Sequence, residues 1–213
     1  MITLLNHMGT DNSICDAARV SMGKSSDGFT PDQNKKLISY LAKNNHWSPF
    51  AHTTVQFRFT APIFIARQLQ KHQVGFAWNE VSRRYVSNTP VLWYPDHFRT
   101  ASASVKQGST DQKHHMSDTL VALFKASNET ALAIYEDMIS RGVCPEQARA
   151  VLPQAMMTEW IWTGSLYAWS RMCNLRLDPH AQREVQTYAA QVSDICRTLF
   201  PLSWSALTVE VNQ

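Results

Sequence analysis

The sequence predicts an α+β fold with a mixed central β-sheet flanked by long helices, in a single domain over residues 1–213. Apolar residues recur at three- and four-residue spacing over most of the chain, which is typical of helices. Residues 53–60 instead alternate apolar and polar side chains, which predicts a strand with one buried face. With 44% hydrophobic and 17% charged residues, the composition is that of one ordinary folded domain.

Three elements are predicted in the first half of the chain. The segment Thr-Pro-Asp-Gln at residues 30–33 supplies a capping hydroxyl, a proline at the first helical position and a glutamine three residues after the cap, so we expect a helix over 31–44. The strand at 53–60 ends just before Pro62. Pro62 can open another helix, which we expect to continue up to Gly75.

The second half combines a polar segment with helical patterns. Residues 87–110 are rich in Ser, Thr, Pro, Asp and Asn, and a loop of this length in a compact domain is usually functional, so we interpret it as a candidate lid. Helical spacing then covers 112–141, with Gly142 placed to end the helix, and a short helix is expected at 145–152.

Near the end of the chain, residues 155–162 are aromatic and fit a strand or a helix, and both readings stay open. Asp178 and Pro179 predict the start of a long amphipathic helix that runs through Leu199. The sequence has no internal repeat and no low-complexity linker.

Charge and cysteine usage narrow the class of protein. A formal net charge of +3 is too small for a nucleic-acid coat but allows a local anion site. The four cysteines form no C-x-x-C pair, which favours a reducing compartment, so we expect a cytoplasmic protein. The longest uncharged stretch, residues 44–57, is too polar to span lipid, and we expect neither membrane nor nucleic-acid partners.

The densest polar cluster is residues 67–85, which hold four fixed cations around one carboxylate, a serine and several amides. Arginines and a serine hydroxyl suit a phosphate monoester. The side chains of Gln68, Asn79 and Glu80 could read the edge of a neutral heterocycle. The alternative reading is a solvated charged face, because charged residues are normally exposed.

A second cluster occupies residues 174–182, where Arg176 comes just before the helix that we expect Asp178 to cap. The positive end of that helix would add to the arginine charge. Together they could hold an anionic form of a ligand and make a proton easier to remove from it. The alternative reading is a salt bridge between helices.

Nucleophile and metal motifs are missing from the sequence. It contains no H-E-x-x-H, no G-x-S-x-G and no P-loop, and no cysteine stands in a nucleophile motif. His46 and His52 are six residues apart, a spacing that fits no metal pattern. Covalent catalysis by cysteine therefore has no support.

Residues 79–85, Asn-Glu-Val-Ser-Arg-Arg-Tyr, resemble the second half of the signature of flavin-dependent thymidylate synthases, which reads Arg-His-Arg, a short spacer with a serine, then Asn-Glu-x-Ser-x-Arg-Tyr. Five further blocks are similar to family blocks in the same order: residues 17–21, 46–52, 61–68, 148–153 and 174–182. The resemblance covers nearly the whole chain.

The chain departs from the family pattern at two places. Lys71-His72-Gln73 stands where the family has Arg-His-Arg, and the spacer 74–78 is one residue longer and lacks the serine. Because two bidentate cations become one ammonium and one amide, we expect flavin phosphate contacts there to be weaker or made differently. The asparagine and arginine that the family commonly carries near residues 164–167 are also missing, and Arg171 is the candidate that compensates.

The resemblance implies a homotetramer with active sites shared between subunits and FAD at their centre. It implies reductive methylation of dUMP to dTMP, with methylenetetrahydrofolate as carbon donor, reduced FAD as hydride donor and NADPH as reductant. No cysteine nucleophile is needed, because the uracil ring is activated by polarisation. Arg176 matches the family arginine proposed to stabilise the deprotonated N3 side of the ring, which makes it the catalytic candidate.

The resemblance also assigns binding residues. The dUMP set is Gln68, Lys71, Glu80, Ser82, Arg83, Arg84, Arg149 and Arg176. Within it, Ser82 and Arg84 are the phosphate candidates, and Arg149 is expected from another subunit. The FAD set is His46, Ser48, Lys71, His72, Gln73, Glu80 and Arg171. Glu80 would lie between nucleotide and flavin, and His46 would also help to position folate.

Two alternatives remain open at this point. A pyrimidine nucleotide hydroxymethylase, or a methylase of dCMP, could arise on the same scaffold if the altered segment 71–73 repositions the flavin. A non-catalytic nucleotide or RNA binder would keep the anion site without flavin, a reading motivated by Lys71 and Gln73.

Overall fold

The computed structural model describes residues 1–103 and 108–209. The chain forms two compact units, each assembled from separate stretches of sequence. Unit 1 comprises Met1–Phe59, Lys71–Asn79 and Ile161–Gln213, and unit 2 comprises Thr60–Gln70 and Glu80–Trp160. The single domain expected over 1–213 stays a prediction. Among the helices in the described ranges, none has the length and apolar character needed to cross a bilayer.

A four-stranded sheet carries the fold, in the order β1 (Ile2–Met8), β2 (Thr54–Pro62), β6 (Met157–Ser165) and β3 (Phe76–Glu80). Strand β1 pairs with β2 in antiparallel register, from Ile2 opposite Phe59 to Met8 opposite Thr54. A separate two-stranded ribbon joins β4 (Arg99–Ala101) to β5 (Ser109–Lys113). Helices and strands in this arrangement confirm the predicted α+β class.

The two long strands follow from side-chain alternation. In β2 the apolar face that the sequence predicts is fully buried, through Val55, Phe57 and Phe59. In β6 every second residue from Thr158 to Gly164 is buried in the same way. The segment left open at 155–162 is therefore largely strand. Its alternation is hard to see in the sequence, because large apolar side chains occupy both faces of the strand.

Trp169, in helix α7 (Leu166–Arg176), forms the centre of the core of unit 1. Its ring lies parallel to that of Phe59 at 6.2 Å, and its indole N–H donates to the carbonyl of Val55 at 3.0 Å. Phe76 of β3 packs 4.8 Å from Trp169 and 4.5 Å from Trp162, measured between ring centroids. One aromatic cluster thus joins β2, β3, β6 and α7.

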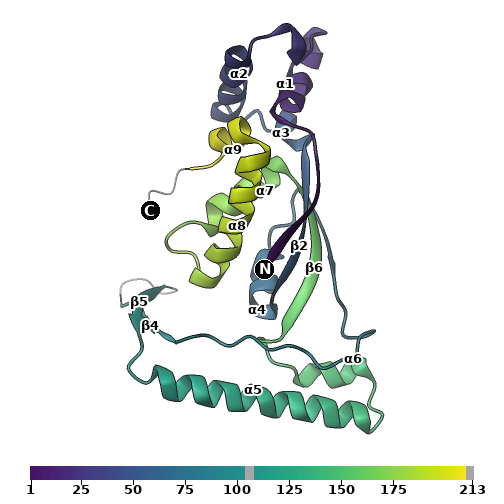
Figure 1. The fold of residues 1–213 in the computed structure, drawn as a ribbon, viewed down its shortest axis with the longest axis vertical. Helices are drawn as coiled ribbons and strands as arrows, with labels where there is room; N and C mark the ends of the chain where they lie inside the picture. Colours follow the sequence, from purple (N-terminus) through teal and green to yellow (C-terminus); the bar gives the residue numbers. More distant parts are fainter. Residues whose placement is uncertain (104–107, 210–213) are drawn as a thin grey trace. The chain divides into compact units, whose positions relative to one another are not determined.

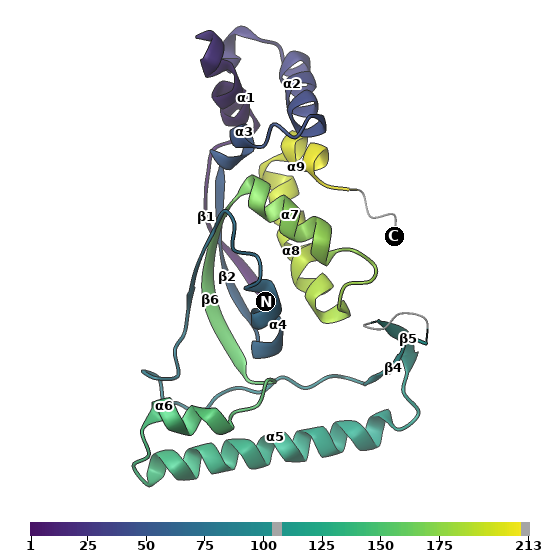
Figure 2. The ribbon, with the colours of Figure 1, turned by 180° about the vertical axis from the view of Figure 1, so that it is seen from behind.

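The remaining helices of unit 1 are α1 (Asp11–Arg19), α2 (Pro31–Lys43), α3 (Ser48–Ala51), α8 (Arg183–Leu199) and α9 (Pro201–Leu207). Helix α2 has the predicted cap, because the Thr30 hydroxyl accepts the N–H of Gln33. Helix α2 packs beside α9, and α7 beside α8 (Figures 1 and 2). The Asp11 carboxylate accepts the N–H groups of Leu202 and Ser203, each at 2.9 Å, and so ties α1 to the start of α9.

Unit 2 contains α4 (Ile63–Leu69), α5 (Ser117–Ser140) and α6 (Pro145–Ala148), which continues as a 3₁₀ turn over Arg149–Val151. Helix α5 packs against α6 (Figure 1). Gly142 has φ +83° just beyond α5, the left-handed conformation of a C-terminal cap, as the sequence predicts. The short helix expected at 145–152 is also present.

Three predicted boundaries are wrong, two of them in unit 2. Helix α4 ends at Leu69 and does not continue to Gly75, because the polar residues that follow offer no apolar side chain at helical spacing. Helix α5 starts at Ser117 and not at 112, since residues 109–113 pair with β4. The loop expected at 87–110 therefore contains strand β4. Residues 104–107 lie outside the described residues, so the lid stays a prediction.

The helix predicted to start at Asp178 begins at Arg183 instead. Asp178 forms a turn, in which its carboxylate accepts the N–H of His180 and its carbonyl accepts that of Ala181. Helix α7 was not predicted, and Arg176 is its last residue. Arg176 therefore lies at the C-terminus of α7 and not directly before the start of a helix. Strands β1 and β3 and helices α1 and α9 were also not predicted.

Replacing Gly164 with alanine tests the aromatic cluster. A Cβ atom on Gly164 would overlap the Phe76 ring, which Trp162 and Trp169 hold on its other sides. We expect Gly164→Ala to lower the free energy of unfolding by roughly 1–3 kcal/mol or more. Gly28→Ala is the control, because nothing lies within 4 Å of the position that its Cβ atom would take. Urea denaturation of both variants measures the difference, and equal stabilities would contradict the described packing.

Candidate functional site

Arg176 and His72 form a direct hydrogen bond in unit 1. Arg176 donates its Nε–H to Nε2 of His72 at 2.9 Å, and both side chains are half-buried. His72 lies in the turn between α4 and β3, 104 positions from Arg176 in the sequence. This bond fixes the tautomer of the imidazole, because a nitrogen that accepts an N–H cannot itself carry a proton.

The electrostatic surroundings keep His72 neutral. Burial lowers its pKa to about 4, and the positive charges of Arg176 and Arg171 add to that shift. Burial also lowers the pKa of Arg176 from its very high ordinary value. The pair at neutral pH is therefore an arginine cation held by an uncharged imidazole.

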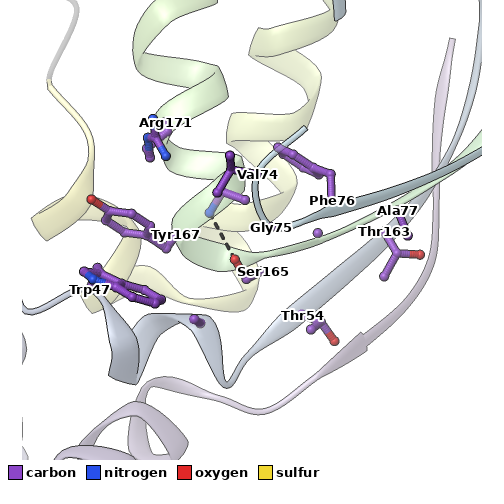
Figure 3. Close-up of a pocket in the computed structure, with 13 residues that line it drawn as sticks. Trp47, Thr54, Val74, Gly75, Phe76, Ala77, Thr163, Ser165, Tyr167 and Arg171 are labelled. Atoms are coloured by element: carbon purple, nitrogen blue, oxygen red, sulfur yellow. Dashed lines mark hydrogen bonds between the residues drawn. The ribbon is translucent and has the colours of Figure 1, made fainter. Parts of the chain in front are cut away.

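A cavity of about 770 Å³ opens in unit 1 between α3, the turn before β3 and the start of α7 (Figure 3). Trp47 and Tyr167 form one side of it, with ring centroids 6.1 Å apart and planes inclined by 36°. The Arg171 guanidinium lies 6.0 Å from the centroid of the Tyr167 ring. The cavity thus combines two aromatic faces with an exposed cation.

Part of the cavity wall is formed by the backbone at Gly75. This residue has φ +82°, and a Cβ atom there would come within 2.9 Å of Ala168. Its carbonyl accepts the N–H of Ser165 at 3.1 Å, and the Ser165 hydroxyl caps α7 by accepting the N–H of Ala168. Glycine is required because the turn must approach the start of α7 closely.

These residues fit a flavin. A cavity of this size is in the range of small-molecule sites, and aromatic faces beside a guanidinium suit a flat heterocycle that carries phosphates. Of the predicted FAD residues, Arg171 lines the cavity. His46 and Ser48 are exposed neighbours of Trp47 in sequence, and Lys71 and Gln73 are exposed on either side of His72.

The predicted nucleotide residues Gln68, Glu80, Ser82, Arg83, Arg84 and Arg149 belong to unit 2. Gln68 is half-buried on α4. The carboxylate of Glu80, the last residue of β3, accepts the hydroxyl of Thr158 at 2.7 Å. A tight turn follows, in which the Ser82 hydroxyl accepts the N–H of Arg84 and the Ser82 carbonyl accepts that of Tyr85. The turn therefore fixes the position of Ser82 relative to Arg84.

Arg84 and Arg149 both meet Glu146 at the start of α6. Nε of Arg84 is 3.9 Å from the Glu146 carboxylate, and Nε of Arg149 donates to the Glu146 carbonyl at 3.2 Å. The side chains of Arg84 and Glu146 are 51% and 61% exposed, so their ion pair is weak and an anion could displace the carboxylate. Within one chain, these two predicted cations therefore both contact Glu146, Arg84 at its carboxylate and Arg149 at its carbonyl.

Arg83 has a different setting. Its guanidinium donates to the carbonyl of Asn88 and to the Asn88 side-chain oxygen, the latter at 3.1 Å. It also lines a second cavity, of about 390 Å³, together with Val81 and Thr158. Arg83 therefore stabilises the segment up to Asn88 through these hydrogen bonds, in addition to any ligand contact.

Sequence reasoning missed Trp47, Tyr167 and Thr158. Trp47 lies inside a block already matched to the family, but composition alone gave no reason to separate it from core tryptophans. Tyr167 stands in a segment where the family pattern fails. Thr158 would have been found by reading residues 157–165 as a strand, because its side chain then shares a face with Trp160 and Trp162.

Comparisons with known proteins identify the family of this chain. The family described as thymidylate synthase complementing protein matches residues 3–202. A flavin-dependent thymidylate synthase of Thermosipho africanus is 35% identical over 206 residues, which cover 96% of this chain and 89% of the relative. One from Kosmotoga olearia is 37% identical, with 96% and 88% covered.

Among solved structures, a UMP/dUMP methylase, PolB from Streptomyces cacaoi bound with 5-Br dUMP, aligns with a TM-score of 0.88 and 26% identity, covering 97% of this chain and 93% of that chain. The expected family, the enzyme class and the dependence on flavin are thereby confirmed. The chain belongs to the thymidylate synthase complementing protein family, the flavin-dependent thymidylate synthases.

Proposed function

We propose that the protein methylates dUMP to dTMP with methylenetetrahydrofolate as the carbon donor and FAD, reduced by NADPH, as the cofactor. Membership of the flavin-dependent thymidylate synthase family over nearly the whole chain is the observation that carries this proposal. The cavity of about 770 Å³ and the half-buried Arg176 in unit 1 support it.

Arg176 is the catalytic residue of the proposal. It is a permanent cation, half-buried, with its Nε–H held by a neutral imidazole. Such a charge favours an anionic state of the uracil ring at N3, and this raises the electron density at the carbon that receives the methylene group. A fixed charge therefore replaces a covalent nucleophile.

The nucleotide residues have two roles. Ser82, Arg84 and Arg149 serve the phosphate, since a hydroxyl and two guanidiniums suit its oxygens. Gln68, Lys71, Glu80 and Arg83 complete the dUMP set, with Glu80 held in place by Thr158. An incoming phosphate would compete with Glu146 for Arg84.

The flavin residues of the proposal are His46, Ser48, Lys71, His72, Gln73, Glu80 and Arg171, and we add Trp47 and Tyr167 because they line the same cavity as Arg171. A bound flavin supplies the hydride. Trp47 and Tyr167 offer apolar faces to its flat ring systems, and Arg171 offers charge to its phosphates. These contacts stand in for the arginine fork that Lys71 and Gln73 do not provide.

The assembly proposed from the family is a homotetramer with shared active sites and with Arg149 supplied by another subunit. His46 would also help to position folate. A cytoplasmic location and the absence of nucleic-acid partners stay predictions.

Product analysis tests the reaction. Purified protein with dUMP, methylenetetrahydrofolate, FAD and NADPH should form dTMP and tetrahydrofolate in equal amounts, measured by chromatography and mass spectrometry. UMP and dCMP are parallel substrates, UMP because the solved relative is a UMP/dUMP methylase. A hydroxymethyl product, or turnover of dCMP alone, would overturn the proposal, and a colourless protein that added FAD cannot saturate would favour a nucleotide binder.

Removal of the polarising charge tests Arg176. We expect Arg176→Ala to lower kcat by at least about 100-fold, as loss of a transition-state charge contact does, with circular dichroism unchanged. Arg197→Ala is the matched control, because this exposed arginine pairs only with Asp194 in its own helix among the contacts described. Near-normal turnover of Arg176→Ala would remove it from the mechanism.

The buried cysteines provide a test against covalent catalysis. Burial raises the pKa of Cys173 and of Cys196 well above the ordinary range, so both thiols stay protonated and unreactive at neutral pH. We expect Cys173→Ser and Cys196→Ser, made separately, to keep kcat within about threefold of wild type where they fold. A folded variant that no longer makes dTMP would show a thiol nucleophile instead.

A further inference from the structure

His72 is held in an unusual electrostatic position. Its imidazole accepts a hydrogen bond from one arginine, Arg176, and a second arginine, Arg171, acts on it from the same helix. Among the described residues, no carboxylate contributes to its shift in pKa. A protonated imidazole there would face two cations and would carry a proton on the nitrogen that must accept the Arg176 Nε–H.

We propose that His72 is a positioning residue for Arg176: as a neutral acceptor at Nε2 it orients the guanidinium so that the Nη groups, and not Nε, meet the pyrimidine. The proposal rests on the proposed function of Arg176 and adds a role for His72 beyond flavin contact. It follows from the 2.9 Å bond between two half-buried side chains brought together from distant parts of unit 1.

The orientation matters because a guanidinium can present either of two edges. An arginine with five N–H donors in a planar fork can bind an oxygen through Nε and one Nη, or through both Nη groups. Because His72 occupies Nε, the edge that presents both Nη groups is the binding edge. A misorientation of about 1 Å at such a group is enough to reduce turnover strongly.

The placement of Arg176 at a helix end makes this anchor necessary. Arg176 is the last residue of α7, and the turn over residues 177–182 follows directly. A long side chain at a helix terminus has many rotamers, each of which costs conformational entropy to exclude. A fixed acceptor on a different segment restricts that freedom at Nε.

The acceptor must stay uncharged over the working pH range. The pKa of His72, about 4, lies below the ordinary value of 6.5, so the folded protein keeps the neutral form as pH falls through the range where a free histidine gains its proton. The bond is therefore retained at neutral pH and lost only as pH approaches about 4.

Nuclear magnetic resonance of protein labelled with ¹⁵N-histidine tests the geometry without substrate or flavin. His72→Gln identifies the resonance. We expect unprotonated Nε2, protonated Nδ1 and a midpoint near 4 in wild type. In Arg176→Gln the midpoint should rise towards 6.5, because a cation is removed while burial remains. A protonated Nε2, or a midpoint that Arg176→Gln does not move, would overturn the proposal.

Kinetics test the consequence for turnover. His72→Phe keeps the ring but removes the acceptor, and His72→Gln places an oxygen near the position of Nε2. With FAD saturating, and its Kd measured separately by fluorescence, we expect His72→Phe to lower kcat between about 10- and 100-fold with a smaller change in KM for dUMP. His72→Gln should recover most of this loss.

The kinetic outcomes separate the possible roles. Full kcat of His72→Phe at saturating FAD would overturn the proposal. Equal kcat losses in the Phe and Gln variants would also overturn it, since the acceptor would then be irrelevant. If the wild type makes no dTMP, the proposed function fails, and the resonance experiment still decides whether His72 orients Arg176.

Discussion

The burial of Trp169 is the interaction on which the rest of unit 1 depends. Its ring lies parallel to Phe59, its N–H is satisfied by the Val55 carbonyl, and Phe76 packs on its edge. Phe76 thereby fixes the segment that carries His72 and Gly75, and Trp169 itself fixes the helix that carries Tyr167, Arg171 and Arg176. A buried aromatic cluster thus sets the distances between polar groups that would bind ligand.

Much of the framework could be predicted from sequence, because local patterns determine it. The cap at Thr30, the alternation through Phe57 and the glycine after α5 each express a rule that operates within a few residues. The missed elements depend on distant partners. Strand β1 depends on its pairing with β2. Helix α7 is buried on most of its sides, so its sequence lacks the one-sided apolar pattern by which a surface helix is predicted.

In the candidate site, too, local sequence features could be read from the chain, whereas contacts between distant residues could not. The family resemblance, carried by residue types and the order of blocks, proposes Arg176, Ser82 and Arg84 as site residues. The partners of these residues could not be found in the same way. The contact of His72 with Arg176 spans 104 positions, and that of Thr158 with Glu80 spans 78. The assignment of Asp178 as a helix cap failed because a local turn competed successfully for its carboxylate.

The bond between Asp11 and the start of α9 has a consequence for biosynthesis. The carboxylate is translated 191 and 192 positions before its partners, the N–H groups of Leu202 and Ser203. Unit 1 includes stretches that precede and follow unit 2 in the sequence, while the residues of unit 2 have all been translated once Trp160 has been added. The aromatic cluster and the pairing of Arg176 with His72 can therefore form only after β6 and α7 have been translated, and until then the apolar face of β2 lacks these partners.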